Sequence, residues 1–177
     1  MNELERFTDI TTFIFDVDGV LTNSQLMILE DGGLLRQMNV RDGYAIKRAL
    51  EKGYQVCVIT GGKSQGVVSR LQGLGVVDIY YGVQDKVEAY REYMDLYDLD
   101  DENVLFMGDD VPDYEVMRLV GFPTCPQDAC SEILSISKYV SDKCGGAGAV
   151  RDVIERTLRL HGKWLPDDPT DELPTSV

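Results

Sequence analysis

Short apolar runs alternate with helical patterns along most of this chain, and this alternation constrains the fold more than any other feature. The runs, rich in β-branched and aromatic residues, cover 12–17, 54–60, 78–81, 103–108 and 121–125. Apolar residues at helical spacing fill 42–52, 64–74, 86–97, 112–120 and, near the end, 149–160. Parallel strands need a crossover connection, usually a helix, so the pattern predicts an α/β fold: a central parallel sheet with helices on both faces.

One segment breaks the alternation. Residues 25–40, QLMILEDGGLLRQMNV, form two extended runs around Asp31-Gly32-Gly33, which predicts a β-hairpin that protrudes from the sheet after its first strand. The LMIL arm is too apolar to stand alone in water. Two interpretations stay open: the hairpin folds onto its own domain, or it is buried against another subunit.

Charge and length limit the classes of function. The 177 residues include 31 acidic and 17 basic side chains, a formal net charge of −14, which disfavours nucleic acid and anionic membranes as partners. No apolar run approaches the roughly 20 residues that span a bilayer, and the first residues lack the features of a secretion signal. The protein is therefore expected in the cytoplasm. One domain is placed at 1–162, and 163–177, with its prolines and acids, is predicted to be a flexible acidic tail.

Polar residues gather where the expected strands end. They are Asp16, Asp18, Thr60, Gly61, Lys63, Asp109, Asp110 and Asp113, with Lys86 at the start of the helix after the third strand. In an open α/β sheet ligands bind at the carboxyl ends of the strands, so these residues are expected to share one edge. Neighbouring carboxylates repel one another unless a cation lies among them, and Mg²⁺ prefers oxygen ligands. The sequence therefore predicts a Mg²⁺ site at this edge.

The residue types also indicate a reaction. A carboxylate held in line with a phosphorus atom, whose oxygens are neutralised by Mg²⁺ and a lysine, can attack it and form an acyl phosphate. A second acid is then needed to protonate the leaving oxygen and later to deprotonate water. Asp16 and Asp18, one residue apart, can supply these two groups. The Thr60 hydroxyl and the N–H groups of the following glycine-rich loop are candidates to hold phosphoryl oxygens.

At this point the chain resembles the haloacid dehalogenase superfamily of phosphotransferases. FDVDGVLT, VITGG, Lys86 and GDDVPD are similar to its four motifs, in the same order and spacing. The resemblance implies that Asp16 is the nucleophile and a Mg²⁺ ligand, and that Asp18 is the general acid/base and binds Mg²⁺ through its backbone carbonyl. The other implied roles are phosphate binding by Thr60, Gly61 and Lys86, metal binding by Asp109, and support from Asp110 and Asp113, which would orient metal-bound water or Lys86.

Members of this superfamily usually select substrates with a cap domain, inserted after the first motif or between the second and third. Here residues 19–59 are used by the hairpin and one helix, and 61–85 by one helix and one strand, so no cap is expected. The expected fold becomes a capless, Rossmann-like three-layer sandwich. An uncapped site acts on a large substrate or is closed by a neighbouring subunit, and the hairpin at 25–40 is the natural contact.

Over about residues 8–162 the chain is similar to the capless 3-deoxy-D-manno-octulosonate 8-phosphate phosphatases, notably in the hairpin, NVRDGYAIKRAL and GGAGAVRDVIERTL. This resemblance implies hydrolysis of that phosphate ester to KDO and phosphate in lipopolysaccharide sugar biosynthesis. It also implies a homotetramer joined through the hairpins, in which a C-terminal segment can reach a neighbouring site. Arg41 and Lys63 are then candidates to bind the sugar acid, although Arg41 could equally form an ion pair that caps the following helix.

Two departures from that family leave the substrate open. Gly62 stands where these enzymes usually have the arginine of ITGRK, and Ala147 and Asp152 stand within their GGRGAVRE segment. The reaction is unaffected, but a nine-carbon ulosonate 9-phosphate, of the nononate or neuraminate type, stays possible; the intact NVRDG favours the eight-carbon substrate. Two further functions stay possible as well: a generalist sugar or nucleotide phosphatase, and an inactive phosphate-binding scaffold protein.

Overall fold

A six-stranded parallel sheet forms the centre of the computed structural model, which describes residues 3–165. The strands are β1 (Thr12–Phe15), β4 (Gln55–Thr60), β5 (Asp78–Tyr81), β6 (Val104–Met107), β7 (Phe122–Cys125) and β8 (Tyr139–Val140). Their order is β5-β4-β1-β6-β7-β8, and every neighbouring pair is parallel. The chain moves outward from β1 to β4 and β5, then returns to the other side of β1, so β1 stands at the topological switch point.

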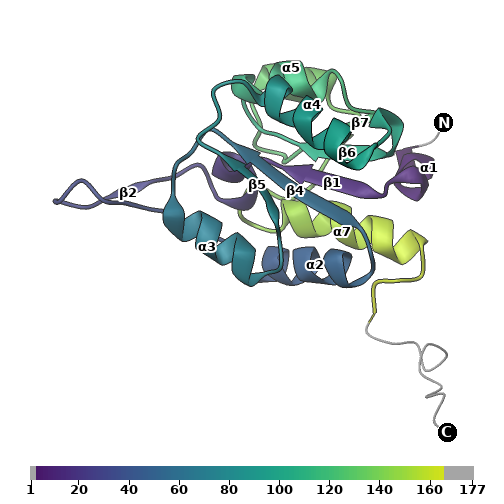
Figure 1. Ribbon diagram of the computed structural model, residues 1–177, viewed down its shortest axis with the longest axis horizontal. Coiled ribbons are helices and arrows are strands. Elements are labelled where there is room, and N and C mark those ends of the chain that lie inside the picture. Colours follow the sequence, from purple (N-terminus) through teal and green to yellow (C-terminus); the bar gives the residue numbers. More distant parts are fainter. Residues whose placement is uncertain (1–2, 166–177) are drawn as a thin grey trace, which may run out of the picture.

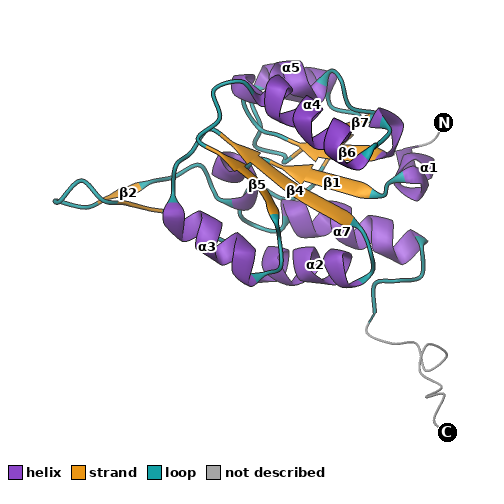
Figure 2. Cartoon of the chain, viewed as in Figure 1, coloured by secondary structure: helices purple, strands orange, loops and turns teal. Residues whose placement is uncertain are grey.

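Helices cover both faces of the sheet, as Figures 1 and 2 show. The helices are α1 (Glu3–Arg6), α2 (Val40–Glu51), α3 (Gln65–Gly73), α4 (Lys86–Tyr97), α5 (Tyr114–Met117), α6 (Ser131–Ile136) and α7 (Ala149–Leu160). Two hydrophobic clusters result: one joins the sheet to α2, α3 and α7, and the other joins it to α4, α5 and α6. The central strands are apolar on both faces because both faces are covered. The predicted three-layer α/β fold is confirmed.

The connections confirm that the sheet carries no cap. Between β1 and β4 the chain forms only a helical turn at Val17–Leu21, the hairpin and α2, and between β4 and β5 only α3. Other details differ from the sequence-based expectation. In place of the helix predicted at 112–120, the chain forms a 3₁₀ turn, Val111–Asp113, followed by the short α5. Neither α6 nor the two-residue β8 was predicted. Elements this short are below the length at which a periodic pattern can be recognised.

The hairpin projects from the sheet edge into solvent (Figure 1). Its strands β2 (Met27–Ile28) and β3 (Leu34–Leu35) are antiparallel, and Gly32 adopts the positive φ of +84° that the turn requires. The side chains of Met27 and Ile28 are 61% and 72% exposed. Within this chain, therefore, the hairpin does not fold onto its own domain, and its apolar residues are left without cover.

The chain after α7 stays against the domain for a few more residues. Trp164 is buried, and its ring lies edge-on to Tyr44 and beneath the guanidinium groups of Arg151 and Arg159. Arg48 Nε donates a hydrogen bond to the Trp164 carbonyl oxygen at 3.1 Å. The first residues of the predicted tail thus belong to the packed structure, and the rest of it, 166–177, lies outside the described residues. No helix within 3–165 is long and apolar enough to cross a membrane.

Candidate active site

The polar residues predicted to meet at the carboxyl edge of the sheet do meet there, on the side from which the hairpin projects (Figure 1). Asp16 follows β1, Thr60 ends β4, Lys86 opens α4, and Asp109 follows β6. They line an open pocket of about 500 Å³. The other predicted residues on its wall are Asp18, Gly61, Asp110 and Asp113. Strands from both sides of the switch point therefore contribute to one site.

Lys86 is the central cation of the pocket. Its Nζ lies 3.0 Å from Asp16 Oδ1 and 2.6 Å from Asp113 Oδ1, and all three side chains are largely buried. Burial raises the pKa of Asp16 to about 7, and the Asp113 charge adds to this while Lys86 opposes it. Burial acts to lower the pKa of Lys86, but the two carboxylates raise it above its usual value. Lys86 therefore stays charged, and it neutralises only part of the acidic cluster.

Asp109 carries the clearest sign of a cation-binding site. Its Oδ1 atom is buried and has no hydrogen-bond partner among the described residues. Burial, followed by repulsion from Asp16, Asp113 and Asp110, raises its pKa to about 7. Carboxylate oxygens of Asp16, Asp109 and Asp113 all lie within 4.8 Å of one another. An unpartnered buried oxygen beside two more carboxylates fits a hard divalent cation such as Mg²⁺.

Two backbone features bring these acids together. The turn after β1 places Gly19 at a φ of +87°, and a Cβ atom there would lie 1.8 Å from Asp109 Oδ2, so only glycine fits. After β6, the Asp109 N–H donates to Asp113 Oδ2 at 3.1 Å, which holds Asp113 beneath the pocket.

Ser24, which sequence analysis missed, donates its hydroxyl to Asp109 Oδ2 at 3.4 Å. No sequence pattern marks Ser24, because it reaches the site through the loop that leads into the hairpin.

The glycine-rich loop after β4 lies across the pocket from the acids. The Gly62 N–H donates to Thr60 Oγ1 at 3.2 Å, which fixes the threonine hydroxyl at the rim. Ser64 then caps α3 by accepting a hydrogen bond from the Val67 N–H at 3.4 Å. The loop thus combines a hydroxyl, backbone N–H groups and a following helix, a combination suited to phosphoryl oxygens.

Asp18 has a partner that sequence analysis did not identify. Arg36, just after β3, forms a two-point ion pair with it: Nε to Oδ1 at 2.7 Å and Nη2 to Oδ2 at 3.2 Å. The sequence offered one signal that could have identified Arg36: it is a cation that directly follows the apolar residues of the hairpin's second strand. Because the hairpin folds back at its base, that cation reaches the reactive edge.

Two predicted substrate-binding residues lie outside this pocket. Lys63 packs its side chain beside Gly82. Arg41 lines a separate and larger groove of about 900 Å³ between the start of α2 and α7. Helix capping at α2 comes from Asn39, whose side chain accepts hydrogen bonds from the backbone N–H groups of Arg41 and Asp42. Binding of the sugar acid by Arg41 and Lys63 stays a prediction.

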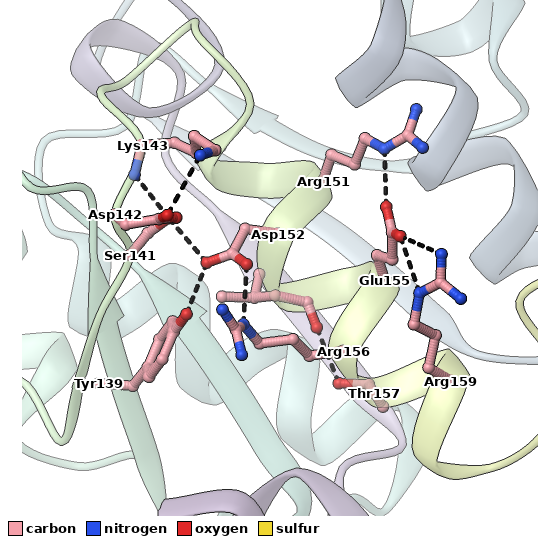
Figure 3. A network of polar contacts seen from close by, with 11 residues as sticks. Tyr139, Ser141, Asp142, Lys143, Arg151, Asp152, Glu155, Arg156, Thr157 and Arg159 are labelled. Atoms are coloured by element: carbon pink, nitrogen blue, oxygen red, sulfur yellow. Dashed lines mark hydrogen bonds and ion pairs between the residues drawn. The ribbon is translucent and has the colours of Figure 1, made fainter.

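The larger groove is not the reactive centre, because the acidic side chains that line it form hydrogen bonds and ion pairs with neighbouring side chains. Figure 3 shows Asp152 accepting hydrogen bonds from the hydroxyls of Tyr139 and Ser141, at 2.6 and 2.8 Å, and from Arg156 at 2.8 Å. Glu155 is similarly held by two arginines of α7. Asp152, one of the departures noted from the sequence, therefore joins α7 to the end of the sheet.

Comparisons with known proteins agree with this geometry. A family model described as haloacid dehalogenase-like hydrolase matches residues 69–154. The 3-deoxy-D-manno-octulosonate 8-phosphate phosphatase of Salmonella typhi is 37% identical over 160 residues, 90% of this chain and 85% of that protein. The crystal structure of the Yersinia pestis enzyme of the same name has a TM-score of 0.88 at 34% identity, covering 91% of this chain and 87% of that one.

A third relative contains the groups that the site would bind. The Moraxella catarrhalis octulosonate phosphatase, solved with a magnesium ion, a phosphate ion and a KDO molecule, has a TM-score of 0.85 at 30% identity and covers 89% of this chain and 90% of that one. The chain therefore belongs to the haloacid dehalogenase-like hydrolases and, among them, to the family of the 3-deoxy-D-manno-octulosonate 8-phosphate phosphatases, and it is a phosphoric monoester hydrolase.

Proposed function

We propose that this enzyme hydrolyses 3-deoxy-D-manno-octulosonate 8-phosphate to KDO and phosphate with Mg²⁺ as its cofactor. The observation that supports this most is the pocket itself, where Asp16 lies against Lys86 and the unpartnered Asp109 oxygen lies close by. Relatives that match about nine-tenths of the chain are named as phosphatases of that ester, and the structure of one contains Mg²⁺, phosphate and KDO.

In the proposed mechanism an Asp16 oxygen attacks phosphorus, the bond from phosphorus to the sugar oxygen breaks, and Asp18 gives its proton to that oxygen. Asp18 then takes a proton from water, which attacks the aspartyl phosphate and releases phosphate and Asp16. Lys86, Thr60 and the N–H of Gly61 hold the phosphoryl oxygens. Asp16, Asp109 and the Asp18 carbonyl would hold Mg²⁺, which would supply positive charge to the phosphoryl group.

Support for this machinery comes from the acids around it. Asp113 fixes Lys86 through its 2.6 Å contact, and we assign Asp110 to the same supporting set, because its carboxylate caps the turn that carries Asp113. Arg41 and Lys63 are proposed to meet the sugar acid, and the nine-carbon ulosonate phosphates stay the alternative substrates. Gly62 and Ala147 leave that alternative open, since they replace arginines of the eight-carbon family.

A steady-state substrate panel tests the proposed substrate. We expect kcat/KM for octulosonate 8-phosphate to exceed that for glucose 6-phosphate by at least about 100-fold, about 2.7 kcal/mol of differential binding. Neuraminate 9-phosphate is expected between the two. Equal values for all three esters would show a generalist phosphatase, and a preference for the nine-carbon ester would establish that substrate instead.

The variant Asp16→Asn separates an enzyme from a phosphate-binding scaffold. The amide keeps the shape of the side chain but is not a nucleophile, so Mg²⁺-dependent phosphate release should fall by about three orders of magnitude or more. Glu115→Asn, on the exposed surface of α5, serves as the control and should turn over normally. Undiminished turnover by the Asp16 variant would exclude its role as nucleophile.

We further propose that the protein works as a homotetramer in the cytoplasm. The exposed apolar side chains of the hairpin are the support for assembly, because a lone hairpin with such residues is unfavourable in water. The open pocket supports it as well, since a neighbouring subunit could supply the cover that a cap provides in other members of the superfamily.

A further inference from the structure

Arg36 joins the hairpin to the reactive edge of the sheet. It follows β3 directly and reaches Asp18 through two hydrogen bonds, from Nε and Nη2, at 2.7 and 3.2 Å. Its side chain is only 10% exposed, whereas that of Asp18 is 41% exposed. The arginine is thus buried by the chain around it, and the acid stays open to the pocket.

Gly62 leaves the space in which this pair stands. A Cβ atom at Gly62 would lie 3.4 Å from Asp18 Oδ2 and 3.6 Å from Arg36 Nη2, so a longer side chain there would compete with the pair. Guanidinium has five N–H donors, and the ion pair uses two. Arg36 lines a small cavity next to the active-site pocket, and Asp18, Thr60 and Gly62 belong to the walls of both, so the guanidinium adjoins the substrate-binding region.

The ion pair conflicts with the proposed reaction unless it opens. Asp18 must give a proton to the leaving oxygen, but here both carboxylate oxygens accept charged hydrogen bonds. Opening the pair leaves a largely buried guanidinium without a partner, which is costly unless another anion replaces Asp18. A substrate that carries its own carboxylate provides that replacement, because one two-point carboxylate pair is exchanged for another.

We propose that Arg36 is a specificity-determining residue that exchanges Asp18 for the carboxylate of the substrate. An acidic sugar phosphate binds Arg36 and releases Asp18 for proton transfer. A neutral sugar phosphate leaves the Asp18–Arg36 pair closed and reacts slowly, so selectivity is expressed in kcat as well as in KM. This inference rests on the proposed function of the site, but it concerns the charge of the substrate rather than its identity.

The test compares two six-carbon esters that differ at one end, 6-phosphogluconate and sorbitol 6-phosphate, with octulosonate 8-phosphate as a third substrate. In Arg36→Ala we expect kcat/KM to fall at least tenfold for both acidic esters, with a rise in KM. For sorbitol 6-phosphate we expect kcat to rise, because Asp18 is no longer held. The preference for 6-phosphogluconate over sorbitol 6-phosphate should therefore collapse.

Two further variants separate recognition from folding. Arg36→Lys keeps the charge but cannot form the two-point pair, so its preference for acidic esters should lie between those of wild type and Arg36→Ala. Arg118→Ala, an exposed arginine packed over Tyr114, is the matched control and should keep the wild-type preference. Circular dichroism with thermal melting confirms that each variant is folded.

An equal loss of kcat/KM on acidic and neutral esters in Arg36→Ala would overturn the inference, because it would show a general structural role. An unchanged preference would overturn it too. Failure of the proposed function has a different signature: wild-type enzyme would then hydrolyse octulosonate 8-phosphate no better than the six-carbon esters, whatever the outcome for Arg36.

Discussion

At the scale of single residues, the site depends on charges that are buried before any substrate arrives. Lys86 contacts Asp16 and Asp113, yet one cation cannot balance three carboxylates within 4.8 Å. The chain tolerates this because Lys86 and the backbone N–H of Asp109 each stabilise Asp113. The remaining imbalance is what makes the site bind a divalent cation.

Another buried acid, Asp42 of α2, lies outside the site and predicts how stability depends on pH. Its Oδ1 accepts the Arg151 N–H of α7 at 2.8 Å, while its Oδ2 is buried without a partner among the described residues. Burial raises its pKa to about 6, from 3.8 for the ordinary group. The folded state therefore binds the proton more tightly than the unfolded state, and this stabilisation is lost as pH rises from about 4 through about 6.

Asp42→Asn keeps the acceptor for Arg151 and removes the charge. We expect the variant to be more stable than wild type at pH 8, by up to about 2–3 kcal/mol, and to lose this advantage at pH 4. Asp42→Ala, which also removes the acceptor, should be destabilised at both values. Urea unfolding at pH 4, 6 and 8 measures this, and a difference that does not change with pH would contradict the assignment to Asp42.

How far each site residue could be predicted from the sequence depends on the element that carries it. Asp16, Thr60 and Asp109 follow directly from strands, so their position in the sequence places them at one edge. Arg36 and Ser24 reach the site from the hairpin and its loop, whose path over the sheet is set by tertiary packing. A one-dimensional pattern contains no information on that path, which is why both were missed.

At the scale of elements, the strength of the local signal decides what could be predicted. The buried strands β1, β4 and β6 are continuous apolar runs, and α4 and α7 were predicted with the bounds that the structure has. In contrast, β8 and α6 are held by contacts with β7 and the neighbouring helices rather than by their own sequences. Short elements of this kind become visible only once the sheet exists.

The segment after α7 gives a prediction at this scale. Trp164 packs against Tyr44 of α2 and two arginines of α7, so it fastens the chain end across both helices. Trp164→Ala removes a buried aromatic ring and should cost about 3 kcal/mol, which lowers Tm by roughly 6–12 °C. Leu165→Ala is the control, because its side chain is 65% exposed and should shift Tm little. Equal shifts in scanning calorimetry would contradict this function of Trp164.

At the scale of the whole molecule, a strongly acidic chain acts on an anionic ester. The net charge of −14 repels such substrates over long range, so binding depends on short-range cations at the pocket. Lys86 and Arg36 are both engaged by acids in the structure. Mg²⁺ bound among the acids would offset part of their negative charge, and the phosphate ester would then contact these two cations.

At the same scale, we expect the hairpin to determine how the protein assembles. Met27 and Ile28 on one strand face Leu35 and Leu34 on the other, and all four side chains are about half exposed or more. Such a patch on a two-stranded hairpin favours burial against other subunits, and hairpins from several copies can cover one another.

We therefore expect light scattering to give the mass of a tetramer for wild type and of a smaller species for Ile28→Lys, because a charge cannot be buried unpaired in an apolar interface. Val77→Lys is the matched control: Val77 is 80% exposed but lies outside the hairpin, and its replacement should leave the mass unchanged. A wild-type protein that is monomeric and fully active at micromolar concentration would contradict both the assembly and the idea that a neighbouring subunit covers the pocket. A tetramer that persists in Ile28→Lys would show that the interface does not include this part of the hairpin, because the lysine would then be exposed to water.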